Sequence, residues 1–412
     1  MCKTCVISGP ETGDLILGHQ RIDFPTYPWE WTPDQWHAAA ELTLNLCEEA
    51  IADGWILKDA TPLNILFDGP NPVLVDVLSA ERRNPGQPVW MAYAQFVRTF
   101  LLPLMARQRF GWPLQSVLNR RDGYEPDDLY PHLSLRQRWQ YPFRSLVTLP
   151  VLLNRRQNKN IDRQPDYHRE VSAEVADAML HHTLRSLRKA LKALRCSPQA
   201  SRWSSYTKTA AHYSEQDHDA KMQFVKAELA LCSPRHVLDV GANTGRYSRL
   251  AASLGASVVA WDSDTEATSE NWRLARDQQL NILPLVADFA RPTPAVGWCN
   301  QESLSLIERS EQRFDCILML GILHHLLLSD QIPLAMIAEL TARITRRWLL
   351  IEWIPATDSQ FISLCRGREA LYSHLSQDAF LQAFSKHFTV RKQSGLPNQR
   401  TLWMLEKQET RA

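Results

Sequence analysis

The sequence predicts an α/β protein whose second half is a doubly wound, seven-stranded Rossmann-like sheet. A smaller, mostly helical α+β accessory domain precedes it. A glycine turn follows a buried strand in VLDVGANTGRYS, residues 237–248, and strand and helix patterns alternate from His236 onward. Two final strands, HFTVRKQ and TLWMLEK, are separated only by SGLPNQR, which favours a hairpin. The other strands are expected near 236–240, 256–262, 282–287, 314–320 and 347–353.

The glycine turn is suited to bringing backbone close to a nucleoside. Asp239 closes the strand, Gly241 and Gly245 shape the turn, and Asn243 lies between them. The turn alone is ambiguous, because nicotinamide enzymes also place glycines after their first strand. Their pattern is G-x-G-x-x-G, whereas here the glycines are four apart and Arg246 stands where the last glycine would fall.

Acidic residues also follow the second and third strands, at the sheet edge where α/β proteins bind ligands. Asp262 lies about 20 residues beyond the first glycine, where a carboxylate can accept hydrogen bonds from both ribose hydroxyls. Asp288 is placed to receive an adenine amino group, and Phe289 beside it is assigned to the same site. At the end of the fourth strand, Leu320 is expected to pack on adenine and Gly321 to line the crevice.

These features resemble the class I S-adenosylmethionine (SAM) methyltransferases, and more narrowly the bacterial methyltransferases related to nodulation proteins. The narrower resemblance covers nearly the whole chain. It is carried by LKDATPLNILFDGPNPVLVDVLSAERR, VWMAYAQFVRTFLLPLM, LDVGANTGRYSRLAA, PAVGWCNQESLSLIER, LGILHHL and LIEWIPATDSQF. It implies the fold, SAM as the cofactor and an enzyme of class EC 2.1.1.-, but not the methyl acceptor. The chain opens within the family pattern, so we expect an earlier portion to be missing.

Three residues are candidates for work on the acceptor. His324 and His325 follow the fourth strand, where one of them would take the acceptor's proton; packing or support of the loop is the other interpretation. Glu352 follows the fifth strand and would bind an amine or hydroxyl, or cap the next helix. The resemblance also suggests Tyr213 and Lys221 as a lid over the cofactor, with ordinary helix surface as the alternative.

We therefore expect a methyltransferase acting on an oxygen or nitrogen nucleophile of a small molecule or biosynthetic intermediate. LGILHHL stands where an N-P-P-[YFW] tetrapeptide would indicate amino-group methylation of bases or glutamine, which argues weakly against those targets. Two alternatives stay open: an RNA methyltransferase, and a non-catalytic or phosphotransferase-derived binding protein.

The second alternative comes from the N-terminal region, where Asp59, Asn64 and Asp76 have the order of a kinase-like catalytic loop. The residues before Asp59 contain neither a glycine-rich loop nor a V-A-I-K-like lysine. A repurposed binding site and a purely structural hairpin are the remaining interpretations. We divide the chain into an accessory domain at 1–150, a helical connector at 151–209 and a SAM domain at 210–412.

The RNA alternative comes from the connector. Between Arg155 and Arg195 there are ten Lys or Arg against five Asp or Glu, on a helix whose leucines from Leu180 to Leu194 form an apolar stripe. This face would meet RNA or an acidic substrate. A helix docked on the core with a solvated basic face explains the pattern as well, and no aromatics or glycines are interleaved.

Composition excludes several classes of protein. The chain has 412 residues and a formal net charge of +1, so no global field selects nucleic acid or an anionic membrane. No apolar run is long enough to cross a bilayer, and the eight cysteines are scattered apart from the C-x-x-C of Cys2 and Cys5. The start of the sequence lacks the apolar core of a signal peptide. We expect a cytoplasmic protein with no metal and no membrane partner.

Overall fold

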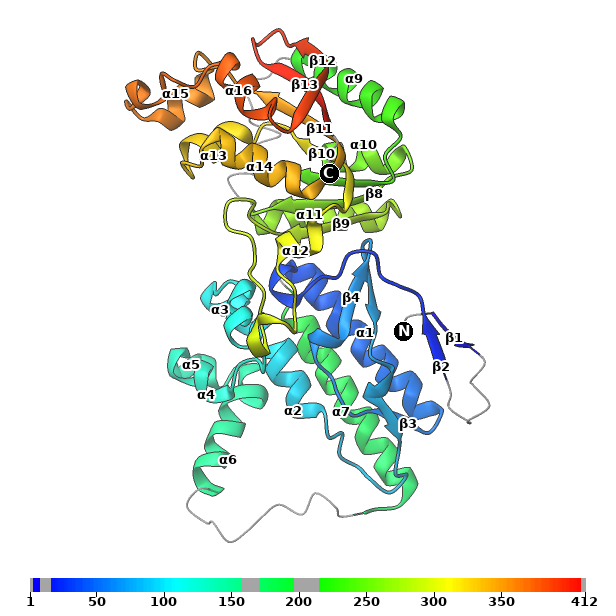
Figure 1. Cartoon of the computed structure of the whole chain (residues 1–412). Helices are drawn as coiled ribbons and strands as arrows, with labels where there is room; N and C mark the ends of the chain where they lie inside the picture. Colours follow the sequence, from blue (N-terminus) through cyan, green and yellow to red (C-terminus); the bar gives the residue numbers. More distant parts are fainter. Residues whose placement is uncertain (1–2, 8–15, 158–169, 196–214, 409–412) are drawn as a thin grey trace. The chain divides into compact units, whose positions relative to one another are not determined.

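The computed structural model describes residues 3–7, 16–157, 170–195 and 215–408 (Figure 1). The chain divides into two compact units, residues 1–197 and 198–412, and each is described by itself.

Unit 1 is built around the long helix α1, Pro33–Ala52. Thr32 begins it with a capping box, in which the side chain of Thr32 accepts from the backbone of Gln35 and Gln35 returns a bond to the backbone of Thr32. Trp31 and Trp36 are fully buried against each other, and Trp31 also packs on Phe67.

Two small antiparallel pairs follow α1 and surround the kinase-like motif. The outer pair is β3, Trp55–Leu57, with β6, Ala80–Arg82, and the inner pair is the hairpin of β4, Ile65–Asp68, with β5, Asn71–Leu74. A third pair lies at the start of the chain, β1, Thr4–Ile7, with β2, Ile16–His19.

The rest of unit 1 is helical, as predicted for the accessory region. Its helices are α2, Tyr93–Phe96; α3, Leu102–Phe110; α4, Pro126–Leu129; α5, Leu135–Arg138; α6, Leu149–Gln157; and α7, Ala173–Ala193. Helix α7 is the basic helix of the sequence analysis. Its leucines are buried, and Arg188 donates to Asn45 and Glu48 of α1. This helix is therefore docked on unit 1.

Unit 2 contains a seven-stranded sheet in the order β12-β13-β11-β10-β7-β8-β9. All strands are parallel except β13, which runs antiparallel between β11 and β12. Its strands are β7, His236–Val240; β8, Ser257–Asp262; β9, Ile282–Val286; β10, Phe314–Met319; β11, Thr345–Trp353; β12, Phe388–Gly395; and β13, Thr401–Lys407. The predicted strands and the predicted final hairpin are confirmed.

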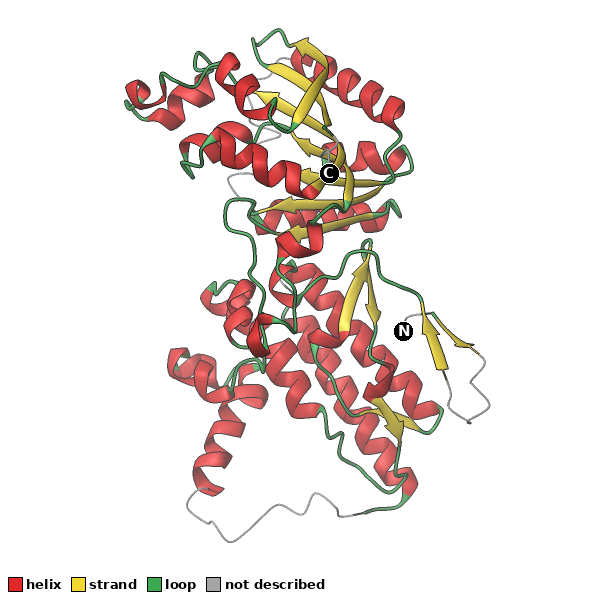
Figure 2. Ribbon diagram, viewed as in Figure 1, coloured by secondary structure: helices red, strands yellow, loops and turns green. Residues whose placement is uncertain are grey.

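Helices cover both faces of this sheet, so its central strands are buried on both sides (Figure 2). On one face, Val237, Val258 and Leu318 join a core with residues of α9, α10 and α11. On the other face, Met319 meets Thr341 of α14 and Trp403 meets Phe380 of α16. The helices are α9, Glu215–Cys232; α10, Arg246–Ser253; α11, Thr265–Asp277; α12, Leu306–Ser310; α13, Leu323–Leu328; α14, Leu334–Ile344; α15, Ser359–Cys365; and α16, Gln377–Phe384.

Candidate active site

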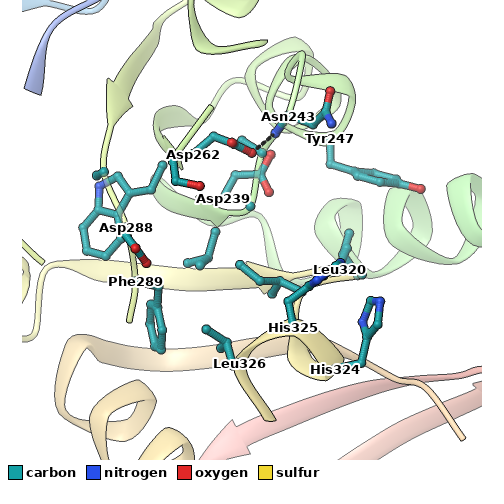
Figure 3. A pocket seen from close by; sticks show the side chains of 18 of the residues that line it. Asp239, Asn243, Tyr247, Asp262, Asp288, Phe289, Leu320, His324, His325 and Leu326 are labelled. Carbon is teal, nitrogen blue, oxygen red and sulfur yellow. Dashed lines mark hydrogen bonds between the residues drawn. The ribbon is translucent and has the colours of Figure 1, made fainter. Parts of the chain in front are cut away.

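A cavity of about 420 Å³ lies at the carboxyl ends of β7, β8, β9 and β10 (Figure 3). Parallel strands bring their ends to one edge, so residues far apart in the chain meet there. The predicted site residues that line the cavity are Asp239, Gly241, Asn243, Asp262, Asp288, Phe289, Leu320, Gly321, His324 and His325. Gly245 and Glu352 are not among the lining residues, and Tyr213 lies outside the described residues.

Gly241 and Gly245, the two glycines of the turn, have different structural roles. Gly241 lines the cavity at φ +71°, and a Cβ there would lie 2.9 Å from Ile322 Cδ1 across the pocket. Gly245 begins α10 at φ +78°, and a Cβ there would lie 1.9 Å from Asn271 Oδ1 of α11. The first glycine keeps space for a ligand, whereas the second lets two helices approach each other.

The carboxylate of Asp262 is held by two backbone N–H groups. Its Oδ2 accepts from Asn243 N at 2.7 Å, and its Oδ1 accepts from Asp264 N at 2.8 Å. Burial raises the pKa of Asp262 to about 6, although these two bonds act in the opposite direction. Asp264 itself caps α11 by accepting from Glu266 N and Ala267 N.

Asp239 lies within β7, one residue before the end of the strand. It is almost fully buried, and its Oδ2 accepts from Ser248 Oγ at 2.6 Å. Burial raises the pKa of Asp239 to about 6 as well, with the charge of Asp262 adding to the effect. Asp239 therefore joins β7 to α10, and Asp262 is the last residue of β8.

Asp288 at the end of β9 lies on the exposed side of the cavity. Its Oδ1 accepts from Ala290 N at 2.8 Å, and its Oδ2 lies 2.9 Å from Arg291 Nη2. The guanidinium of Arg291 also reaches Asp330, at 3.1 Å, and thereby joins β9 to the end of α13. Phe289 beside Asp288 is buried and gives this part of the cavity an aromatic wall.

Glu352 lies behind the cavity wall in a buried ion cluster. Its Oε2 is 2.6 Å from Lys221 Nζ, and its Oε1 is 3.6 Å from Arg400 Nη1. Arg400 also donates to both oxygens of Asp358, through Nε at 2.8 Å and Nη2 at 3.1 Å. Two buried cations thus meet two buried carboxylates, and both cations line the cavity. This position lets Glu352 anchor Lys221 and Arg400, and a contact of Glu352 with the acceptor stays a prediction. The next helix, α15, is capped by Asp358.

His324 and His325 lie together on the first turn of α13. Their rings are 4.2 Å apart between centroids. Burial, together with the nearby His325, Arg400 and Lys221, holds the pKa of His324 well below its ordinary value. Its Nδ1 has no hydrogen-bond partner among the residues that the structure describes. His324 is therefore a neutral imidazole at pH 7, with one ring nitrogen unengaged by the protein.

Several lining residues were not predicted. Tyr247 and Arg246 lie directly in the glycine motif, and helical spacing from Gly245 could have identified them. Arg400 comes from the start of the last strand, about 160 residues beyond the motif, and no local pattern marks it. Trp261 was treated as part of a buried strand, yet it also lines the cavity.

In unit 1, Ser79 bridges two residues of the kinase-like motif, Asn64 and Asp76. Asn64 Nδ2 donates to Ser79 Oγ at 2.7 Å, and Ser79 Oγ donates to Asp76 Oδ2 at 2.8 Å. Ser79 thus links Asn64 and Asp76, whose counterparts in a phosphotransferase hold magnesium. Within the described ranges, no group of three or more His, Cys, Asp or Glu side chains is arranged to hold a metal ion.

The strand order and the position of the cavity define the class of fold. From β9 through β11 the order is that of a dinucleotide-binding sheet, and the antiparallel β13 inserted beside β11 is the feature that sets methyltransferase sheets apart. Unit 2 has the fold of the class I SAM-dependent methyltransferases, as the sequence predicted. Over the part of the chain that the structure describes, no helix is both long and apolar enough to span a membrane.

The chain resembles nodulation protein NoeA from Rhizobium meliloti (strain 1021). The two are 29% identical over 399 residues, which cover 96% of this chain and 82% of NoeA. Among solved structures, it is similar to the N-methyltransferase NodS from Bradyrhizobium japonicum WM9, at 12% identity and a TM-score of 0.35 over 48% of this chain and 99% of NodS. Another is magnesium protoporphyrin IX methyltransferase from Synechocystis PCC 6803 with bound SAH, at 13% identity and a TM-score of 0.35 over 52% of this chain and 90% of that one. No protein-family model matches the chain.

Proposed function

We propose that this protein is a SAM-dependent methyltransferase that moves a methyl group to an oxygen or nitrogen nucleophile of a small molecule or biosynthetic intermediate. The observation that carries the proposal is Asp262 at the cavity wall, with each carboxylate oxygen fixed by one backbone N–H. Each oxygen keeps acceptor capacity for a second donor, and a ribose presents two hydroxyls side by side.

The residues present fit the cofactor along the sheet edge. A cavity of about 420 Å³ is within the range of small-molecule sites, and the lack of a side chain at Gly241 keeps it open toward Ile322. Asp262 would hold the ribose, Asp288 the adenine amino group, and Phe289 and Leu320 the faces of the adenine ring. The amino end of α10 would receive the carboxylate of the methionine portion, because backbone N–H groups point out of a helix there.

The acceptor would lie beside α13. SAM supplies the electrophilic methyl group and its leaving group, so the protein has to orient the nucleophile and accept its proton. His324 is placed for that task because its ring is neutral at pH 7, as its lowered pKa implies, and its Nδ1 has no hydrogen-bond partner among the described residues. Oxygen and nitrogen acceptors carry such a proton, which is why we favour them. His325 lies against His324, with the two rings tilted by 45°, and would support its orientation.

The two alternatives have less support. Two basic residues of α7 are engaged within unit 1, where Arg188 bonds to α1 and Lys189 lies over the ring of Tyr141. A nucleic-acid partner would need those side chains. In the kinase-like motif, Ser79 already joins Asn64 to Asp76, which favours a structural hairpin over a magnesium site.

The test is calorimetric titration with SAM of the wild-type protein and of Asp262→Ala. We expect the substitution to abolish measurable SAM binding while the circular dichroism spectrum stays that of the folded wild-type protein. Asp277→Ala is a matched control, because Asp277 is an exposed acid on the adjoining α11 and should leave affinity unchanged. Unchanged SAM affinity in Asp262→Ala would overturn the site assignment.

The acceptor class is tested separately, by incubating the protein with SAM carrying a labelled methyl group and a panel of small alcohols, phenols, carboxylic acids and amines. Label transferred to oxygen or nitrogen supports the proposal. Label found only on carbon or sulfur, or on added RNA, contradicts it.

A further inference from the structure

The cavity at the carboxyl ends of the strands has an acidic end that the function proposed above uses only in part. Asp288 and Phe289 lie there, at the opposite end of the site from His324 (Figure 3). A second acid, Asp330, lines the cavity as well, and so does the basic side chain of Arg291. Arg291 therefore stands among acids that belong to the candidate cofactor site.

The guanidinium of Arg291 connects two segments of the chain. Its Nη2 lies 2.9 Å from Asp288 Oδ2, after β9, and its Nη1 lies 3.1 Å from Asp330 Oδ1. Asp330 is itself fixed to the end of α13, because its backbone N donates to His325 O at 3.1 Å. Both terminal nitrogens of Arg291 are thus engaged by carboxylates, and a planar guanidinium that meets two acids has little freedom to turn.

The same contacts fix the carboxylate of Asp288. Its Oδ1 accepts from Ala290 N at 2.8 Å, and its Oδ2 faces Arg291. One donor on each oxygen sets the plane of the carboxylate, and each oxygen keeps a lone pair for another donor. An ionised carboxylate only accepts, so this plane decides which N–H group of a ligand Asp288 can meet.

Stability alone explains the position of Arg291 poorly. Its side chain is 74% exposed, and exposed ion pairs contribute little to folding. Asp288 and Asp330 are less exposed, at 28% and 18%, and both line the cavity. Without Arg291, two like charges would remain on adjoining walls, and Asp288 would be held at one oxygen only. The effect of Arg291 therefore falls on the cavity.

We propose that Arg291 is a positioning residue for recognition of the cofactor's purine: it orients the Asp288 carboxylate toward the 6-amino group, while Asp330 holds the guanidinium away from the purine. This inference rests on the proposed function. A carboxylate fixed in this way accepts from an amino group at position 6, whereas an oxygen at that position would bring two acceptors together. Arg291 and Asp330 thus contribute to the choice of an adenine over a hypoxanthine ligand.

The probes are S-adenosylhomocysteine and S-inosylhomocysteine, which differ only at position 6 of the purine, where the second carries an oxygen in place of the amino group. Calorimetric titration of the full chain with each gives a ratio of dissociation constants. We expect the wild-type protein to bind S-adenosylhomocysteine about tenfold or more tightly. Arg291→Gln should lower this ratio by about three- to fivefold, the size of effect that an exposed ion pair can have. Asp330→Asn should lower the ratio as well.

A role that acts through Asp288 makes a further demand. In an Asp288→Ala background, Arg291→Gln should leave the ratio unchanged, because the carboxylate that Arg291 orients is gone. Arg291→Lys keeps the charge without the fork of donors and should recover part of the ratio. Arg343→Gln is the matched control: Arg343 pairs with Glu311 on the surface and is not among the cavity-lining residues, so the wild-type ratio should remain.

A wild-type ratio in Arg291→Gln would overturn the proposal even if both affinities fell, since a purely structural residue moves the two together. Equal affinity of the wild-type protein for the two ligands would overturn it too, and would leave the proposed function intact. A loss of ratio that persists in the Asp288→Ala background would show that Arg291 meets the purine directly, which refutes a positioning role. Failure of the wild-type protein to bind S-adenosylhomocysteine would overturn the proposed function itself, and this proposal with it.

Discussion

Replacing Glu352 by glutamine tests whether Glu352 anchors Lys221 and Arg400 or instead contacts the methyl acceptor. The substitution keeps the shape of the side chain but removes the charge that faces Lys221 and Arg400, which are 5% and 2% exposed. Breaking a buried ion pair by removing one partner costs about 3–5 kcal/mol, because the remaining charge is left without compensation. In urea, with an m-value of about 3 kcal/mol/M for a unit of this size, a loss of about 3 kcal/mol lowers the unfolding midpoint by about 1 M.

The control is Glu311→Gln, which removes the charge of a carboxylate that pairs with Arg343 on the surface. Exposed pairs contribute about 0–1 kcal/mol, so this midpoint should move little. A double-mutant cycle with Lys221→Met should then give a coupling of about 0.5–3 kcal/mol between Lys221 and Glu352. If Glu352→Gln keeps wild-type stability but loses turnover, our account of Glu352 as an anchor is refuted.

Three further predictions concern Gly245, Asp262 and His324. Gly245→Ala should destabilise unit 2 by about 3 kcal/mol in urea, because its Cβ would overlap Asn271 at a positive φ; Gly255→Ala, also at positive φ but with no atom within 4 Å, should cost about 1 kcal/mol. Asp262 has a folded-state pKa of about 6, above its ordinary 3.8, so the folded protein binds more protons than the unfolded chain between these values. Stability should therefore fall as pH rises from about 4 to about 6, and Asp262→Asn should flatten that slope in urea titrations. SAM affinity, measured by calorimetry, should rise through the same window, since ribose needs the ionised carboxylate; an affinity independent of pH would count against this role. His324→Gln should lower kcat by about 10²–10⁴ with SAM affinity preserved, and an unchanged kcat would place the base elsewhere.

Much of the fold of unit 2 follows from local sequence pattern. The central strands are continuous apolar runs because helices cover both faces, and each run ends at a turn or an acidic residue that the sequence displays openly. The part of the cavity formed by β7, β8 and β9 was predictable for the same reason: parallel strands bring Asp239, Asp262 and Asp288 to one edge.

The part of the cavity near α13 was less predictable, because it depends on contacts between distant segments. Nothing near Glu352 indicates that Lys221 of α9 and Arg400, just before β13, meet there, so its buried position could not be predicted from spacing. In unit 1 the motif of Asp59, Asn64 and Asp76 predicted the hairpin, but the bridging role of Ser79 appears only in three dimensions. The contact of Arg291 with Asp330 is likewise a property of tertiary packing.

The central claim is that unit 2 binds SAM in the cavity at the carboxyl ends of its strands. Calorimetric titration of the wild-type chain with SAM and with S-adenosylhomocysteine tests it most directly, with ATP and magnesium as the competing pair. The account predicts one-to-one binding of both adenosyl ligands with micromolar dissociation constants and no heat from ATP and magnesium. Binding of ATP and magnesium without either adenosyl ligand would contradict it.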